Sequence, residues 1–132
     1  TISQFAAMPR RTRQLRGWLA RLSQCAPAQV DRLRKRSVSP RRFIDEARSA
    51  IGWFLADIEF AAMEGRPYIV PDASQLGALG ALDHLLREMK RSAEPDYCTE
   101  AALQQSGKWA SIRVSARMAL VTFDWTQNRQ SG

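Results

Sequence analysis

The sequence is poor in the residues that form disulfides or bind metals. Two cysteines, Cys25 and Cys98, and one histidine, His84, are spread over 132 residues. A small disulfide-stabilised secreted protein usually carries more cysteines, and a zinc site needs Cys or His at close spacing. We therefore expect two free, buried thiols, an exposed histidine paired with Glu88, and neither a metal nor a cofactor.

Long apolar runs are missing as well. No stretch approaches the roughly 20 apolar residues that a membrane-spanning helix needs. Residues 1–8 are followed by arginines rather than preceded by them, which is the reverse of a secretory signal peptide. We therefore expect a cytoplasmic protein without a membrane span.

Acidic residues are scarce in the first third of the chain. Residues 1–48 hold 12 Arg and Lys against 3 Asp and Glu, whereas residues 49–132 hold 8 against 10. The net charge of +7 therefore comes from the first third. Seventeen of the 20 basic residues are arginine, whose guanidinium group binds phosphate through paired hydrogen bonds. A GC-rich genome would give the same arginine bias, so the segregation of charge is the stronger indication of an anionic partner.

Helical periodicity is what the sequence does contain, over most of its length. With 45% hydrophobic residues the chain can form a core, and 132 residues suit one domain. That domain has a basic amino-terminal third, residues 10–48, and a near-neutral scaffold, residues 49–127. The pattern predicts an all-α bundle of five or six helices. These helices are expected at residues 10–25, 28–36, 40–64, 73–92, 99–106 and 108–125.

Residues 40–64 are expected to form one long central helix. Ser39 can accept a free amide of the first turn, and Pro40 suits the first helical position. One apolar stripe comprises Phe43, Ile44, Ala47, Ile51, Phe54, Leu55, Ile58, Ala61 and Ala62. A second stripe, on nearly the opposite side, comprises Trp53, Ala56, Phe60 and Met63. Two apolar sides predict burial of both within the chain, and contact of one with a partner is the alternative.

The neighbouring helices have one apolar face each. Residues 10–25 place arginines opposite a face formed by Leu15, Trp18, Leu19, Leu22 and Cys25. Such a helix could also lie on anionic lipid, but burial of its apolar face in the core explains the pattern more simply. Asp72 and Gln75 resemble a capping box for the helix at 73–92. The inward face of that helix is formed by Leu76, Leu79, Leu82, Leu85, Leu86 and Met89.

Residues 108–125 fit two patterns. Apolar residues alternate with polar ones from Ile112 to Leu120, as in a half-buried strand, but Trp109, Ile112, Ala116 and Leu120 also share a helical face. A strand would have only residues 68–70 as its partner, and an isolated strand pair is marginal in water. We therefore favour a helix.

The segment 32–42, RLRKRSVSPRR, is the densest basic stretch. Arg41 and Arg42 follow the helix start at Ser39, where the partial positive charge of the helix makes them unfavourable for stability. Free amide groups, the helix dipole and guanidinium groups all favour a phosphate at this turn, and a solvated basic turn is the alternative. We expect a nucleic-acid-binding surface formed by Arg10, Arg13, Arg32, Arg34, Lys35, Arg36, Ser39, Arg41 and Arg42.

The run SVSPRRFIDEARSAIG, with the helix before it, resembles the helix-turn-helix of AraC-type regulators, in which a V-S-P turn precedes the recognition helix. The resemblance spans residues 28–52. It implies that Arg41, Arg42 and Asp45 face a DNA groove and that Phe43 contacts the core. In composition alone, the chain is also similar to the small helical subunits of nucleoprotein machines such as CRISPR effector complexes.

No group of residues meets the usual criteria for a catalytic site. The acidic residues Asp57, Glu59 and Glu64 point in different directions around their helix, and no glycine-rich loop follows a strand. We therefore expect a non-catalytic nucleic-acid-binding accessory protein, with DNA and RNA both open as targets.

The alternative is a protein–protein adaptor or inhibitor of the kind that phages and plasmids encode. It would dock on an acidic partner, or on a second copy of itself, through Trp53, Phe60 and Met63 together with arginines. Exposure of Trp53 and Phe60 in the folded monomer would favour this alternative.

Overall fold

The computed structural model describes residues 10–65, 71–93 and 95–125, which contain six α-helices and no β-strand. The expected all-α fold is thereby confirmed. In chain order the helices are α2 (Arg10–Leu22), α3 (Ala26–Arg36), α4 (Pro40–Met63), α5 (Ala73–Arg91), α6 (Glu100–Gln105) and α7 (Gly107–Thr122).

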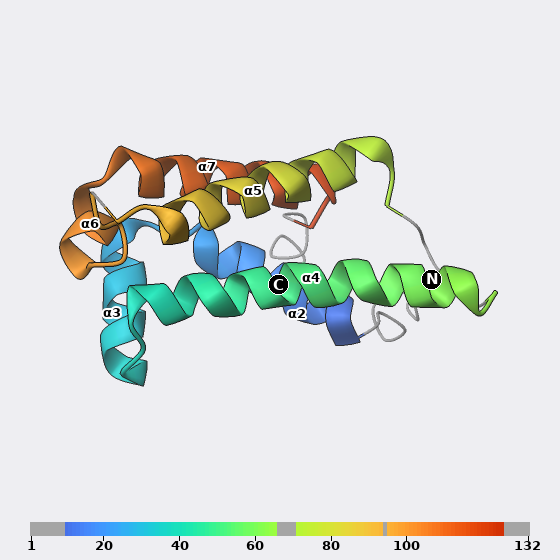
Figure 1. Cartoon of the computed structure of the whole chain (residues 1–132), viewed down its shortest axis with the longest axis horizontal. Helices are drawn as coiled ribbons and strands as arrows, with labels where there is room; N and C mark the ends of the chain where they lie inside the picture. The colour runs from blue at the N-terminus through green and yellow to red at the C-terminus, as the bar shows by residue number, and fades with distance from the viewer. Residues whose placement is uncertain (1–9, 66–70, 94, 126–132) are drawn as a thin grey trace.

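Four of the helices form a ring around the hydrophobic core. Both α2 and α5 pack against α4 and α7, and successive helices of the ring run in opposite directions (Figure 1). The two short helices α3 and α6 pack on each other at one end of the ring. This is the up-down-up-down arrangement that short connections favour. The largest fully buried side chains are Trp109, Leu15, Leu19, Leu22, Ile44, Leu79, Leu82, Leu86, Met89, Leu103 and Ile112.

Side-chain caps fix the helix starts. Ser39 Oγ accepts a 3.1 Å hydrogen bond from the backbone amide of Arg42, which confirms the cap expected before α4. Asp72 Oδ1 accepts from the amide of Gln75, and Gln75 Oε1 accepts from the amide of Asp72, both at 2.9 Å. The capping box expected before α5 is therefore present as well.

The segment that fitted two patterns, residues 108–125, mostly forms helix α7. The residues of the helical face, Trp109, Ile112, Ala116 and Leu120, are all buried. Met118, which alternation would have placed inside a sheet, is 58% exposed. The strand alternative is therefore wrong, and its only available partner, residues 68–70, lies outside the described residues. Two prolines also predict an extended stretch at residues 66–72, and residues 128–132 are expected to form a frayed tail. Residues 66–70 of that stretch and the whole tail lie outside the described residues.

Two details of the apolar faces need correction. Cys25 is exposed, because α2 ends at Leu22 and Cys25 stands at the start of α3 instead. Leu76 is 41% exposed. The neighbouring residue Gln75 donates a hydrogen bond through Nε2 to the carbonyl oxygen of Thr122, the last residue of α7. Leu76 therefore lies at the end of the four-helix ring, where α7 no longer covers it.

The length of α4 determines how much of it the neighbouring helices cover. It has 24 residues, against 13 in α2, 19 in α5 and 16 in α7. At 1.5 Å per residue α4 is about 36 Å long and α2 about 20 Å. The carboxyl end of α4 therefore projects past its neighbours (Figure 1). Among the described helices, none combines the length and apolar character that crossing a membrane requires.

Candidate nucleic-acid interface

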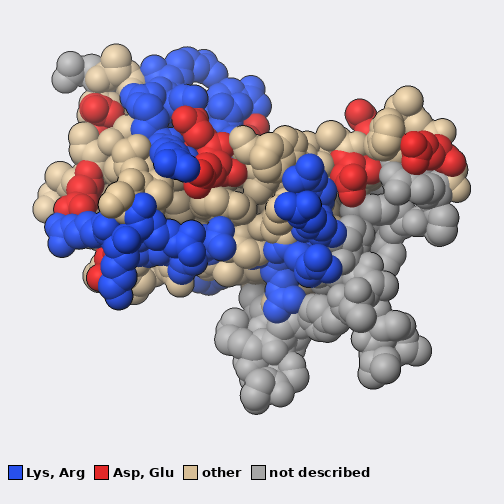
Figure 2. Space-filling view, turned by 90° about the horizontal axis from the view of Figure 1, so that it is seen from below, with Lys and Arg blue, Asp and Glu red and all other residues tan. Residues whose placement is uncertain are grey.

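Basic side chains gather on the face formed by α2 and α3. Figure 2 views the molecule from below and shows Lys and Arg along these two helices, a further group of basic side chains mixed with acidic ones at the top, and acidic side chains on the projecting end of α4 at the right. The excess of positive charge in the first third of the sequence thus gathers mainly on one face. Leu15, Leu19 and Leu22 are buried, so the apolar side of α2 packs in the core. That side is therefore not available to lie on lipid.

Three arginines from two helices lie close enough to repel one another. The pKa of Arg21 is lowered, first by its partial burial and then by the positive charges of Arg32 and Arg36. Glu46 opposes this effect, but its Oε2 already accepts a 3.0 Å hydrogen bond from Nε of Arg42. We call Arg21, Arg32 and Arg36 the arginine cluster. It concentrates positive charge at a place where the fold gains nothing from it.

Within the described part of the chain, Arg32 and Arg36 make no hydrogen bond or ion pair. Their guanidinium groups are therefore available to an external anion. Guanidinium groups bind phosphate oxygens through two parallel hydrogen bonds, which a nucleic-acid backbone offers repeatedly.

A groove of about 480 Å³ runs between α2 and α4 beside the arginine cluster. Gly17 and Ala50 leave space in it because they have little or no side chain. Trp18 and Trp53 carry a guanidinium group over their rings, that of Arg21 at 4.8 Å and that of Arg11 at 4.7 Å. The residues that line the groove are Arg10, Arg13, Gln14, Gly17, Trp18, Arg21, Ala50 and Trp53.

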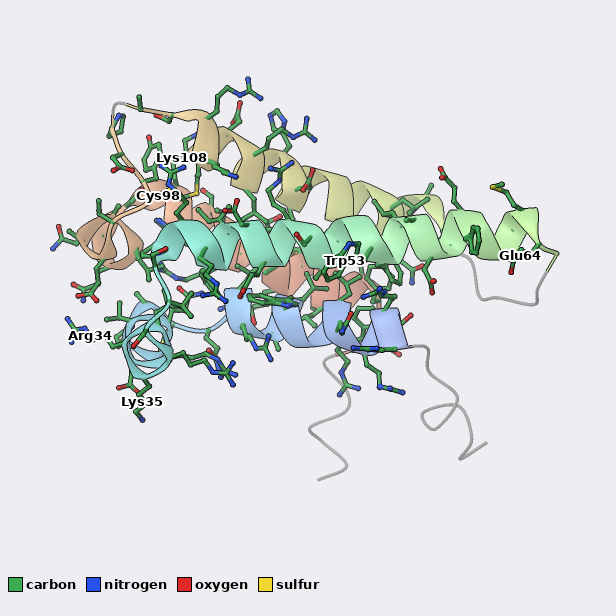
Figure 3. The ribbon with its side chains drawn as sticks, turned by 60° about the horizontal axis from the view of Figure 1, so that its bottom comes forward. Arg34, Lys35, Trp53, Glu64, Cys98 and Lys108 are labelled. Atoms are coloured by element: carbon green, nitrogen blue, oxygen red, sulfur yellow. The ribbon has the colours of Figure 1, made fainter. Side chains whose placement is uncertain are left out.

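The predicted site residues of α3 fall into two groups. Arg32 and Arg36 belong to the arginine cluster, whereas Arg34 and Lys35 lie on the outer sides of α3, away from α2 (Figure 3). Nε and Nη2 of Arg34 donate to Glu100 of α6 at 2.9 and 2.5 Å, and this raises the pKa of Arg34. Nζ of Lys35 lies 3.1 Å from Asp31. Both pairs are exposed, so water and salt compete with them.

The predicted site residues at the start of α4 also have different surroundings. Ser39 serves the helix start, and Arg42 pairs with Glu46. Arg41 lies on the side of Cys98, where its charge opposes the burial that raises the pKa of that thiol. The structure therefore does not bring Arg41 and Arg34 together with the arginine cluster. Arg10 and Arg13 line the groove.

The turn expected between α3 and α4 is present, but the two helices belong to different parts of the bundle. Ser37, at φ 56°, ends α3. Val38 and Ser39 follow, and α4 begins at Pro40. The main packing partner of α3 is α6, whereas α4 packs on α2 and α5. In a helix-turn-helix the two helices form one unit that presents the second helix to DNA. Asp45, expected to face a groove, pairs with Lys90 of α5 at 2.5 Å.

The second apolar stripe of α4 is exposed, so its expected burial within the chain is wrong. Trp53 is 52% exposed, Phe60 55% and Met63 79%. The described helices α2 and α5 pack on the other side of α4, where its buried residues lie. The sequence pattern identified this stripe correctly, and its exposure favours the alternative, contact of the stripe with a partner.

Arg21 was not among the expected site residues. A signal was present, because Arg10, Arg13, Gly17 and Arg21 recur at helical spacing and therefore share one side of α2. His84 lies exposed with its Nε2 3.3 Å from Glu88, as expected. Within the described residues, no three His, Cys, Asp or Glu side chains gather where they could hold a metal ion.

Comparisons of the chain with family models, with curated proteins and with solved structures found no match. The features of the molecule that indicate a function are therefore the arginine cluster, the groove and the exposed face of α4.

Proposed function

We propose that the protein is a non-catalytic accessory protein that binds the phosphate backbone of a nucleic acid through α2 and α3. The observation that carries this proposal is the arginine cluster. Partial burial and then the positive charges of Arg32 and Arg36 lower the pKa of Arg21, and the acidic group that opposes them, Glu46, is already paired with Arg42. A bound polyanion removes this repulsion among the three arginines, so the resulting gain in free energy favours the complex. We place this function in the cytoplasm, in keeping with two free thiols, Cys25 and Cys98.

The groove supports the same proposal. Arg21 belongs both to the arginine cluster and to the groove wall, so a chain that crosses the cluster also passes Trp18 and Trp53. Aromatic rings beside guanidinium groups are typical of surfaces that hold unpaired bases next to phosphates. The groove volume of about 480 Å³ lies within the range of ordinary ligand sites, roughly 300–1,000 Å³.

The test compares double-stranded DNA, single-stranded DNA and RNA of equal length at two salt concentrations. The variant Arg32→Gln/Arg36→Gln removes two charges from the arginine cluster. We expect weaker binding to the preferred target and a salt slope reduced by about 2, because each lost phosphate contact removes about one unit. The variant should be at least as stable as the parent, since like charges are removed.

The matched control is Arg91→Gln/Lys108→Gln on α5 and α7. These two side chains are exposed and make no ion pair within the described residues, and the change in net charge is the same. We expect this control to bind nearly as well as the parent. Equal losses in the two variants would show a general charge effect, and an unchanged slope for Arg32→Gln/Arg36→Gln would remove the proposal.

A further inference from the structure

The exposed residues of α4 form a regular seam. Trp53, Ala56, Phe60 and Met63 are separated by three, four and three residues, and all four are exposed. This alternation places them on one line along the helix and is the spacing of a coiled-coil contact face. We call these four residues the α4 seam.

The α4 seam takes no part in the hydrophobic core of the described residues. Figure 3 shows Trp53 on α4 close to the start of α2, where the guanidinium group of Arg11 covers its ring at 4.7 Å. Farther along, α4 projects past α2 toward Glu64 (Figure 3). Large apolar groups aligned on a projecting helix mark an interaction site more often than isolated exposed ones do.

The flanks of the α4 seam are acidic. Asp57 and Glu64 each follow a seam residue, and Glu59 precedes one, so all three take the flanking positions that pair with the partner in a coiled coil. Residues 49–65 contain no Lys or Arg. Asp57 and Glu59 make no ion pair within the described part of the chain.

Asp57 and Glu59 gain no ion pair from the described part of the fold. The carboxyl end of a helix carries partial negative charge and favours basic side chains, but the last turn of α4 has none. Basic side chains of a partner would pair with Asp57 and Glu59 and complement the helix dipole. The partner chemistry is therefore basic rather than acidic.

A second copy of the chain does not meet this requirement. In a parallel pair of α4 helices Glu59 would face Glu64 of the other copy, and in an antiparallel pair Asp57 would do so. The basic helix α2 offers positive charge, but its apolar face is buried in the core of its own ring. Self-association through the α4 seam is thus disfavoured in both orientations.

We propose that the α4 seam is the docking site for an amphipathic helix of another protein, with Lys or Arg on both sides of its apolar seam. The α4 seam meets the nucleic-acid groove only at Trp53, and its other three residues lie farther along α4. One molecule can therefore engage a polyanion at the arginine cluster and a cationic helix at the α4 seam at once. The second partner would then link the nucleic-acid-bound protein to a larger assembly.

The test uses three synthetic helical peptides of equal length as probes of the full chain. The first has Leu at the seam positions and Lys at the flanks, the second has Glu in place of Lys, and the third has the composition of the first with its seam scrambled. We expect the first to bind at least tenfold more tightly than the other two. Equal binding of the first and third peptides would show nonspecific charge attraction and overturn the proposal.

Variants assign the binding to the α4 seam. Phe60→Ala/Met63→Ala should weaken binding of the Lys-flanked peptide at least tenfold, and Asp57→Asn/Glu59→Gln should reduce its advantage over the Glu-flanked peptide. The matched control Val114→Ala/Met118→Ala removes apolar groups of α7 that are 54% and 58% exposed. We expect this control to leave the affinity unchanged. If Phe60→Ala/Met63→Ala and the control both bind the Lys-flanked peptide as tightly as the parent does, the α4 seam is not the site.

Sedimentation of the free protein tests self-association. We expect a monomer at concentrations up to those of the peptide experiment. A dimer that Phe60→Ala/Met63→Ala disrupts would assign the α4 seam to a second copy and overturn the proposal. Peptide binding by Arg32→Gln/Arg36→Gln should equal that of the parent, so failure of the nucleic-acid proposal and failure of this one are distinguishable.

Discussion

Gln29 of α3 and Arg113 of α7 are joined by a 2.8 Å hydrogen bond from Arg113 Nε to Gln29 Oε1. The amide nitrogen of Gln29 donates to the carbonyl oxygens of Arg21 and Leu22, each at 3.0 Å. The last carbonyl groups of α2 lack partners within that helix, so one buried amide completes its end and connects three helices. Arg113 also donates to the carbonyl oxygen of Leu103, which adds α6.

Replacement of Gln29 by Leu should therefore destabilise the fold strongly. Gln29 is 1% exposed, so Leu would remove the side-chain partner of the Leu22 carbonyl oxygen and one hydrogen bond each of the Arg21 carbonyl oxygen and the Arg113 guanidinium. The burial that lowers the pKa of Arg113 makes this loss more severe. We expect a loss of about 2–4 kcal/mol in the free energy of unfolding, measured by urea denaturation. Gln104→Leu, at an exposed position of α6, is the control and should change it little; similar losses in both variants would contradict this interpretation.

Ser37→Gly should stabilise the protein. Ser37 ends α3 at φ 56°, a conformation that costs non-glycine residues about 1–2 kcal/mol. Glycine adopts it freely while the amide hydrogen bonds to Arg34 and Leu33 carbonyl oxygens at the helix end are kept. We expect a gain of about 1 kcal/mol in thermal or urea unfolding. Ser49→Gly inside α4 is the opposite control, with an expected loss of about 0.5 kcal/mol.

The exposed pair of Arg34 and Glu100 predicts a pH dependence. The hydrogen bond from Arg34 lowers the pKa of Glu100 below its ordinary value of 4.5. The folded state therefore favours the carboxylate, so the pair stabilises the fold above pH 4.5 and ceases to do so as the pH falls through the lowered pKa. We expect Glu100→Gln to lower the unfolding temperature at pH 7 but not at pH 3. Glu59→Gln, which removes no ion pair of the described residues, should show no such difference; a gap that persists at pH 3 would exclude the ion pair as its cause.

Gly17 provides a test of the groove. An added Cβ at Gly17 meets no atom within 4 Å, so a side chain can start there without a clash, and Leu improves helix propensity. Gly17→Leu should raise the unfolding temperature and obstruct the groove, with nucleic-acid affinity reduced about tenfold, equivalent to about 1.4 kcal/mol. Gly80→Leu on α5, where the surroundings are equally open, should raise stability and leave the affinity unchanged. If Gly17→Leu binds as tightly as the parent, the groove is not part of the interface.

Local chemistry explains which features could be predicted. Ser39 and Asp72 were recognisable as caps because a cap depends on residues within one turn of it. The apolar spacing of Trp109, Ile112 and Ala116 likewise favoured a helix before any neighbour was known. By contrast, the buried position of Gln29 and the pairing of Arg34 with Glu100 depend on residues far along the chain. No local pattern encodes those contacts.

The candidate site shows the same division. The sequence by itself determined that positive charge is concentrated in the first third, that α4 has two apolar sides, and where most helices begin, because charge, periodicity and caps are local properties. The tertiary structure decided that Arg21, Arg32 and Arg36 converge while Arg34 and Arg41 point elsewhere. It also decided that one apolar side of α4 lies in the core and the other in solvent, because α2 and α5 both pack on the same side of α4.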